Sequence, residues 1–311
     1  MGKLRFSPFA GTLDEWGDCL KTFPDADIFQ TPAWLRFIAE SQGGRIVVAA
    51  LQRGGTTLGY FAGLVVKRLG FRILGSSFPG WTTPYMGIRL RDETERLPAL
   101  QALEDYAFHE LKCIHMEVFD RGFTTEHASR LGFALRQVSG FEVDLTRGEE
   151  ELFAAMSSAC RRCVRKAERS GVIVERAEDE RFADEYYDQL VDVFAKQSLV
   201  PTYPRDRVRL LVRHLLPTGM LLLLRARDAD GRCIATGIFP AMNRYMYFWG
   251  GPVGARTKSY GPTNSCSGMR CDIGGIAGLR AMTCAEAANT RENTGEETFV
   301  TLGCTSRSMV F

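Results

Sequence analysis

The same order of strands and turns occurs twice in this chain, and this repeat constrains the fold more than any other feature of the sequence. The segments with strand-like patterns are 46–51, 58–66 and 71–74 in the first set and 221–225, 233–239 and 245–249 in the second. Gly54-Gly55 and Asp230-Gly231 stand where hairpins need turn residues. Ile46 and Leu221, Leu58 and Cys233, and Gly75 and Gly250 are each 175 residues apart. Each set therefore predicts an antiparallel meander.

Helical segments precede each meander. In the first half, Thr31-Pro32-Ala33-Trp34 opens a short helix, with threonine at the cap and proline in the first turn. In the second half, 182–196 carries an apolar stripe at helical spacing, and 205–216 is a second helix. Helices followed by a meander, occurring twice, predict an α+β duplication.

The boundary between the two halves is expected near Thr146-Arg147-Gly148, after the strand at 141–145. The predicted domains are 1–146 and 147–262, and the remaining residues, 263–311, form an atypical tail. The alternating carboxylates of this strand, Glu142 and Asp144, share one face of it and are interpreted as solvated.

Composition narrows the class of protein. The chain has 311 residues, of which 45% are hydrophobic and 24% charged, and its formal net charge is only +2. Affinity for phosphates must then come from a local cluster of basic residues, and no DNA partner is expected. The sequence shows no signal peptide and no membrane span, so we predict a cytoplasmic protein with reduced cysteines and no metal. Cys160 and Cys163 have metal-ligand spacing, but no second pair follows.

The densest group of charges lies on the helical segment 161–169. Arg162, Arg165, Lys166 and Arg169 are three or four residues apart and form a cationic face. Such a face can hold a phosphate or pyrophosphate through charge-assisted hydrogen bonds. The alternative is a solvated surface helix.

Several motifs in this order resemble FemAB-like proteins. They are Arg-x-x-Val-Arg-Lys-Ala-Glu-Arg-Ser-Gly-Val at 161–172, Leu-Val-Pro-Thr-Tyr at 199–203, the second meander, and Phe-Gln-Thr-Pro-Ala-Trp-Leu at 29–35. This family includes the aminoacyltransferases of peptidoglycan interpeptide bridges and the acetyltransferase-domain proteins found with cellulose and exopolysaccharide synthesis genes. The resemblance covers about residues 25 to 262.

The resemblance implies two tandem acetyltransferase-like (GNAT) domains, each a mixed, mostly antiparallel sheet flanked by helices. It also implies transfer of an acyl or aminoacyl group to a cell-envelope or exopolysaccharide precursor. The donor would be acyl-CoA or aminoacyl-tRNA, and the acceptor a small molecule or a lipid- or nucleotide-linked sugar. The alternative is a non-catalytic binding protein, or the inactive product of a frameshifted gene.

Five residues are candidates for binding the donor or the acceptor, and no catalytic residue is named. Arg162 and Lys166 match basic positions of the family motif, and Tyr203 matches an aromatic residue that would face the cleft. Gly250 and Gly251 open the stretch nearest to a glycine-rich phosphate loop. The alternative for Arg162 and Lys166 is a solvated helix, and for Tyr203 a packed loop tyrosine. For the two glycines it is a loop that closes a hairpin. Trp34 is interpreted as a core anchor of its helix.

The sequence changes character after Pro262. Four of the nine cysteines follow it, and 285–298 has no apolar period. FemAB-like proteins continue with a tryptophan-bearing helix, a Tyr-Asp-x-x-Gly-Gly segment and a Lys-Tyr/Phe-Gly motif, and a one-base shift of the reading frame permits all three in this order. We therefore interpret 263–311 as an out-of-frame tail and the second domain as incomplete. Residues past about Gly278 are expected to be poorly ordered, with the first tryptic cuts after Arg280 or Arg291.

Overall fold

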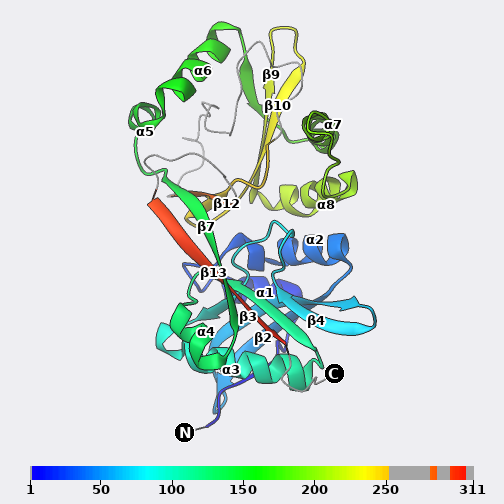
Figure 1. The fold of residues 1–311 in the computed structure, drawn as a ribbon, viewed down its shortest axis with the longest axis vertical. Helices are drawn as coiled ribbons and strands as arrows, with labels where there is room; N and C mark the ends of the chain where they lie inside the picture. Colours follow the sequence, from blue (N-terminus) through cyan, green and yellow to red (C-terminus); the bar gives the residue numbers. More distant parts are fainter. Residues whose placement is uncertain (1, 252–280, 286–294, 306–311) are drawn as a thin grey trace. The chain divides into compact units, whose positions relative to one another are not determined.

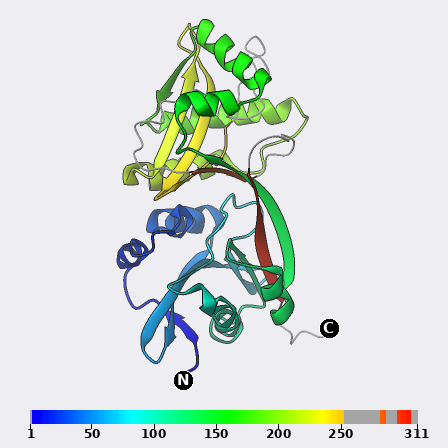
Figure 2. The same ribbon diagram turned by 90° about the vertical axis from the view of Figure 1, so that its left-hand side faces the viewer.

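The computed structural model describes residues 2–251, 281–285 and 295–305. The chain forms two compact units, Met1–Ser139 with Glu297–Phe311 (unit 1) and Gly140–Glu296 (unit 2). Each unit is a mixed sheet with helices packed on it (Figures 1 and 2), which confirms the α+β prediction. The division between the units lies inside strand β7 (Ala134–Asp144), whereas the sequence placed it just after this strand.

The sheet of unit 1 is built around the first predicted meander. Its strands are β1 (Arg5–Pro8), β2 (Arg45–Arg53), β3 (Thr56–Arg68), β4 (Phe71–Ser76), β5 (Ile88–Leu90), β6 (His115–Asp120) and β13 (Gly295–Thr305). Strands β1 to β4 pair antiparallel in chain order, and β5 pairs with β3. Strand β6 lies parallel to β4 and antiparallel to β13. The meander is therefore confirmed, and the strands beside it are additions that the sequence patterns did not predict.

The helices of unit 1 are α1 (Leu13–Leu20), α2 (Pro32–Gln42), α3 (Arg96–Asp105) and α4 (Thr125–Leu131). Helix α2 begins as predicted, because the Thr31 hydroxyl accepts a hydrogen bond from the Trp34 N–H at 3.3 Å. The indole of Trp34 is 0% exposed, and its Nε1 donates to the Thr83 hydroxyl at 3.3 Å. The interpretation of Trp34 as a core anchor is confirmed.

Unit 2 repeats the order of unit 1. Its strands are β8 (Ile173–Arg176), β9 (Leu221–Arg227), β10 (Cys233–Met242), β11 (Tyr245–Tyr247), β12 (Ala281–Ala285) and the second part of β7. Strands β8 to β11 pair antiparallel in chain order, as β1 to β4 do. Strand β12 lies parallel to β11, as β6 lies parallel to β4, and pairs antiparallel with β7. The predicted duplication thus extends over the whole sheet.

The helices of unit 2 are α5 (Glu149–Ala155), α6 (Ser158–Arg169), α7 (Arg181–Ala195) and α8 (Arg205–Leu215). Helices α5 and α6 lie on one side of the sheet and α7 and α8 on the other (Figures 1 and 2). The predicted helices at 161–169, 182–196 and 205–216 are confirmed within one to three residues at their ends.

Two strands, β12 and β13, lie in the tail that follows Pro262. The expectation of poor order past Gly278 stays a prediction, because strand pairing alone does not test it. A sheet edge offers main-chain N–H and C=O groups to any extended segment, so pairing does not require an apolar period in the added strand. The expected tryptic sites at Arg280 and Arg291 lie outside the described residues. The strands do not bear on the reading frame, which depends on the nucleotide sequence.

Candidate functional site

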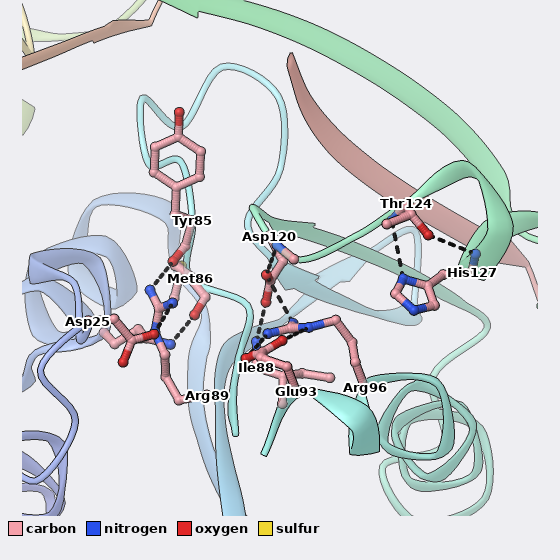
Figure 3. A network of polar contacts seen from close by, with 12 residues as sticks. Asp25, Tyr85, Met86, Ile88, Arg89, Glu93, Arg96, Asp120, Thr124 and His127 are labelled. Carbon is pink, nitrogen blue, oxygen red and sulfur yellow. Dashed lines mark hydrogen bonds and ion pairs between the residues drawn. The ribbon is translucent and has the colours of Figure 1, made fainter. Parts of the chain in front are cut away.

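A buried ion pair is the centre of a polar network in unit 1 (Figure 3). Asp120 is 2% exposed and Arg96 5%, and a guanidinium nitrogen of Arg96 lies 3.0 Å from the Asp120 carboxylate. The N–H groups of Ile88 and Gly122 each donate to the same carboxylate at 2.7 Å. Arg96 also reaches the exposed carboxylate of Glu93 at 2.6 Å. The charges compensate each other within the unit, so this network needs no ligand.

Arg89 holds a second branch of the network together (Figure 3). Its Nε donates to Gln30 Oε1 at 2.7 Å, and the amide of Gln30 donates to the carbonyl of Met86. The Gln30 carbonyl accepts a hydrogen bond from the Trp16 indole at 2.8 Å. Gln30 is 0% exposed, so in this structure the motif at 29–35 connects the first helices to the sheet.

A second group of polar side chains lies in unit 2, and we call Tyr186, Tyr203, Arg207, Trp249 and Gly250 the Tyr203 cluster. Tyr186 comes from α7, Tyr203 from the loop before α8, Arg207 from the first turn of α8, and Trp249 and Gly250 from the segment after β11. Their positions follow from the packing of α7 and α8 against each other and of α7 on β10.

The two tyrosine hydroxyls of the cluster lie against each other, 3.1 Å apart. The ring of Tyr203 lies 5.6 Å from that of Trp249, and the ring of Tyr186 lies 6.3 Å from it. A Cβ atom added at Gly250 would stand 2.2 Å from the Tyr186 hydroxyl. Any side chain at Gly250 would therefore displace this hydroxyl, and the close approach requires glycine.

Arg207 brings a positive charge into the cluster. It is 5% exposed, and its guanidinium carbon lies 5.2 Å from the ring centre of Tyr203 and 5.8 Å from that of Trp249. Burial lowers the pKa of Arg207, but a guanidinium stays charged in proteins. Burial also raises the pKa of Tyr203, and the hydrogen bond with Tyr186 and the charge of Arg207 oppose this only in part. Tyr203 therefore stays a neutral hydroxyl donor near pH 7.

Trp249 supplies a donor that lacks an acceptor. Its side chain is 7% exposed, and its buried Nε1 has no hydrogen-bond partner in the part of the chain that the structure describes. Leaving such a donor unpaired costs about 1–3 kcal/mol. An indole N–H, a tyrosine hydroxyl and a guanidinium thus lie in one cluster, and donors of these kinds suit an oxygen that carries or gains negative charge.

The sequence model of the acetyltransferase (GNAT) domain family matches residues 154–266, which include every member of the Tyr203 cluster. The chain therefore contains a GNAT acetyltransferase domain. Among the curated protein sequences, no significant match to this GNAT protein was found.

Solved structures show the same tandem fold. The crystal structure of FemX is 13% identical with a TM-score of 0.72, over 94% of this chain and 96% of that chain. A tandem GNAT protein from the clavulanic acid biosynthesis pathway is 13% identical with a TM-score of 0.55, over 99% and 100%. The C-terminal domain of a putative lysylphosphatidylglycerol synthetase from Agrobacterium fabrum is 12% identical with a TM-score of 0.52, over 94% and 92%. The FemAB-like, tandem GNAT fold expected from the sequence is confirmed.

The structure of this GNAT protein brings together two of the five predicted site residues. Tyr203 and Gly250 both touch the Tyr186 hydroxyl, and Gly251 is next in the chain. Tyr203 is half-buried and packs on Trp249, so both interpretations of it, the packed loop tyrosine and the site residue, fit its position. The rest of the glycine-rich loop, 252–256, lies outside the described residues.

Arg162 and Lys166, the other two predicted residues, lie apart from the Tyr203 cluster. Both are exposed on α6, which is across the sheet from α7 and α8 (Figure 1). Only Val164 of this helix is buried. Within the described residues, neither cation forms an ion pair. A role for them in binding phosphates stays a prediction.

Changing Arg162 and Lys166 together to alanine is expected to weaken donor or acceptor binding about tenfold and to reduce its salt dependence. The melting temperature should stay nearly unchanged, because both side chains are exposed. Binding isotherms at several salt concentrations measure this effect. Lys196→Ala with Arg213→Ala, which removes two other exposed cations of unit 2, is the matched control. Equal binding by both double variants would make α6 a solvated helix.

The sequence patterns did not single out Tyr186, Arg207 or Trp249. Tyr186 belongs to the apolar stripe of α7, and Trp249 ends a strand-like segment, and both patterns are typical of core residues. The one local signal was the spacing of Tyr203 and Arg207, which are four residues apart across the start of a helix.

The residues that the structure describes lack two features, a metal-binding group and a membrane-spanning helix. No group of three or more histidine, cysteine or acidic side chains there could hold a metal ion. Cys160 and Cys163 are free thiols on α6, and burial raises the pKa of Cys160. Nor does that part of the chain contain a helix with the length and apolar character needed to cross a bilayer.

Proposed function

We propose that this GNAT protein transfers an acyl or aminoacyl group to an amine or hydroxyl of a cell-envelope or exopolysaccharide precursor, and that the Tyr203 cluster binds the carbonyl oxygen of the transferred group. Acyl transfer is the chemistry of the acetyltransferase (GNAT) domain family whose model matches residues 154–266. The observation that carries the proposal is the buried Trp249 N–H, which has no acceptor among the described residues and lies near the charge of Arg207 and the ring of Tyr203.

The proposed chemistry uses this site for electrostatic stabilisation. When the nucleophile of the acceptor attacks the acyl carbon, a new C–N or C–O bond forms and the carbonyl oxygen gains negative charge. Collapse of this intermediate breaks the bond to the donor's sulfur or oxygen, and the proton of the acceptor leaves with the departing group or to solvent. The indole N–H, the Tyr203 hydroxyl and Arg207 would each stabilise the oxyanion, and orientation of the acceptor would supply the rest.

The donor and the acceptor are proposed from chemistry and resemblance. GNAT proteins generally use acyl-CoA, and aminoacyl-tRNA is the second donor class that a FemAB-like chain suggests. Both carry phosphates, which Arg162 and Lys166 would contact. The acceptor would be a small molecule or a sugar linked to a lipid or a nucleotide.

The test is a transfer assay with the purified full chain. The chain is incubated with radiolabelled acyl-CoAs and aminoacyl-tRNAs, each with amino-sugar, nucleotide-linked and lipid-linked acceptors. Label should move to an acceptor at a rate that depends on protein concentration. Retention of a donor without transfer would instead favour the alternative, a non-catalytic binding protein or an inactive gene product.

We also propose that residues 263–311 are translated out of frame. The GNAT family match supports this, because it ends at residue 266, shortly after Pro262. The nucleotide sequence of close relatives is expected to differ by a one-base insertion or deletion near the Pro262 codon. A protein with the frame restored should then transfer label faster than the chain as it stands. An unbroken frame shared with those relatives would rule the proposal out.

A further inference from the structure

The hairpin between β3 and β4 ends in an exposed apolar tip. Leu69 is 98% exposed and Phe71 is 47% exposed. The hairpin projects from the sheet of unit 1 (Figure 1). Leu69 and Gly70 form its turn and have φ values of 49° and 85°. Neither side chain belongs to the hydrophobic core of unit 1.

The local backbone gives no reason for a leucine in this turn. A two-residue hairpin turn with positive φ at both positions favours asparagine followed by glycine, and a leucine in the left-handed region is strained. Burial does not offset this strain, because the side chain of Leu69 is almost entirely in water. Neither turn formation nor packing accounts for Leu69.

Cations surround the apolar tip. Segment 67–72 contains Lys67, Arg68 and Arg72 and no acidic residue. Lys67 and Arg72 stand directly opposite each other in the ladder, which is an unfavourable placement for like charges. Among the described residues, none of the three forms an ion pair, and Arg72 donates only to the carbonyl of Leu111, at 3.2 Å. The tip thus combines two exposed apolar side chains with three cations that form no ion pair among the described residues.

We propose that this hairpin tip docks the protein on an anionic membrane surface. Leu69 and Phe71 would leave water for the boundary between headgroups and acyl chains. The three cations would stay among anionic headgroups, and each is expected to raise affinity roughly fivefold near such a surface. Nucleic acid is a poorer fit, because single-stranded sites use aromatic faces for stacking, and the aliphatic Leu69 at the apex offers none. Docking goes beyond acyl transfer and is measured without donor or acceptor.

The experiment is co-sedimentation of the full chain with lipid vesicles. Vesicles of phosphatidylcholine with phosphatidylglycerol should bind the protein, whereas vesicles of phosphatidylcholine alone should bind it weakly, and added salt should reduce binding. The test variant is Leu69→Asn with Phe71→Ser. Its partition coefficient should fall at least about tenfold, because apolar transfer is lost. Its melting temperature should not fall, because asparagine suits the turn.

A second exposed apolar pair provides the matched control. Leu199 is 56% exposed and Val200 80%, and the nearest cation in the sequence, Lys196, is three residues before the pair, whereas two cations directly precede Leu69. Leu199→Ser with Val200→Ser should bind anionic vesicles as the unchanged chain does.

Three outcomes would overturn docking by the hairpin tip. They are failure of the unchanged chain to bind anionic vesicles, equal binding by the hairpin variant, and an equal loss in the control. Retention of tRNA that needs Lys67 and Arg68 but not Leu69, without vesicle binding, would make the hairpin a nucleic-acid surface instead. Each result is independent of transfer activity.

Discussion

Tyr203→Phe is expected to lower kcat/KM for acyl transfer by about 10²–10³-fold, the usual effect of removing one donor from an oxyanion site. The variant loses the hydroxyl that lies 3.1 Å from the Tyr186 hydroxyl and keeps the ring that packs on Trp249. Its stability should fall by only about 1 kcal/mol, the net value of one hydrogen bond. Steady-state kinetics and thermal melting on the same preparation measure the two effects.

Two further variants sharpen this test. Trp249→Phe removes the unpaired indole N–H and should also lower kcat/KM by about 10²-fold. Tyr187→Phe is the matched control, because the Tyr187 hydroxyl donates to the main-chain carbonyl of Tyr203 at 2.9 Å and not to the cluster's side chains. Like Tyr203→Phe, this variant loses one hydrogen bond, but its kcat/KM should stay within about fivefold of that of the unchanged chain. If neither Tyr203→Phe nor Trp249→Phe slows transfer beyond the control, the Tyr203 cluster is not the oxyanion site.

Asp120→Ala is expected to destabilise unit 1 by about 3–5 kcal/mol. The substitution leaves the 5% exposed Arg96 without its buried partner and removes the acceptor for two main-chain N–H groups. Glu93→Ala removes the other carboxylate of the same guanidinium, but the Glu93 side chain is 63% exposed. That variant should cost only about 0–1 kcal/mol. Urea denaturation of both variants measures the difference.

A double variant separates the loss of the ion pair from the cost of leaving one buried charge without its partner. Arg96→Met with Asp120→Ala removes both charges and should be less destabilised than Asp120→Ala alone, because no buried charge is left uncompensated. The prediction fails if Asp120→Ala and Glu93→Ala destabilise the protein equally, or if the double variant is less stable than Asp120→Ala alone. The first result would mean that the buried carboxylate contributes no more than the exposed one, and the second that the hydrogen bonds of Ile88 and Gly122, and not the charge pair, hold the network.

The sequence by itself determined the elements whose signals are local. Turn residues at Gly54-Gly55 and Asp230-Gly231 predicted both meanders, and the Thr31-Pro32 cap predicted the start of α2. The helices predicted at 182–196 and 205–216 were also correct. These features depend on neighbours a few residues away, so their physical causes can be seen in a short stretch of sequence.

The tertiary structure alone decided which distant residues meet. Strands β12 and β13 pair with β11 and β6 through main-chain hydrogen bonds, so the tail needs no apolar pattern in its sequence to form them. The Tyr203 cluster joins a tyrosine from a helical stripe, a loop tyrosine and a tryptophan after a strand, and each of these alone resembles a core residue. Arg96 and Asp120 likewise pair only because a helix packs beside a strand. Burial and the pairing of charges are properties of the packed chain, so a local pattern does not contain them.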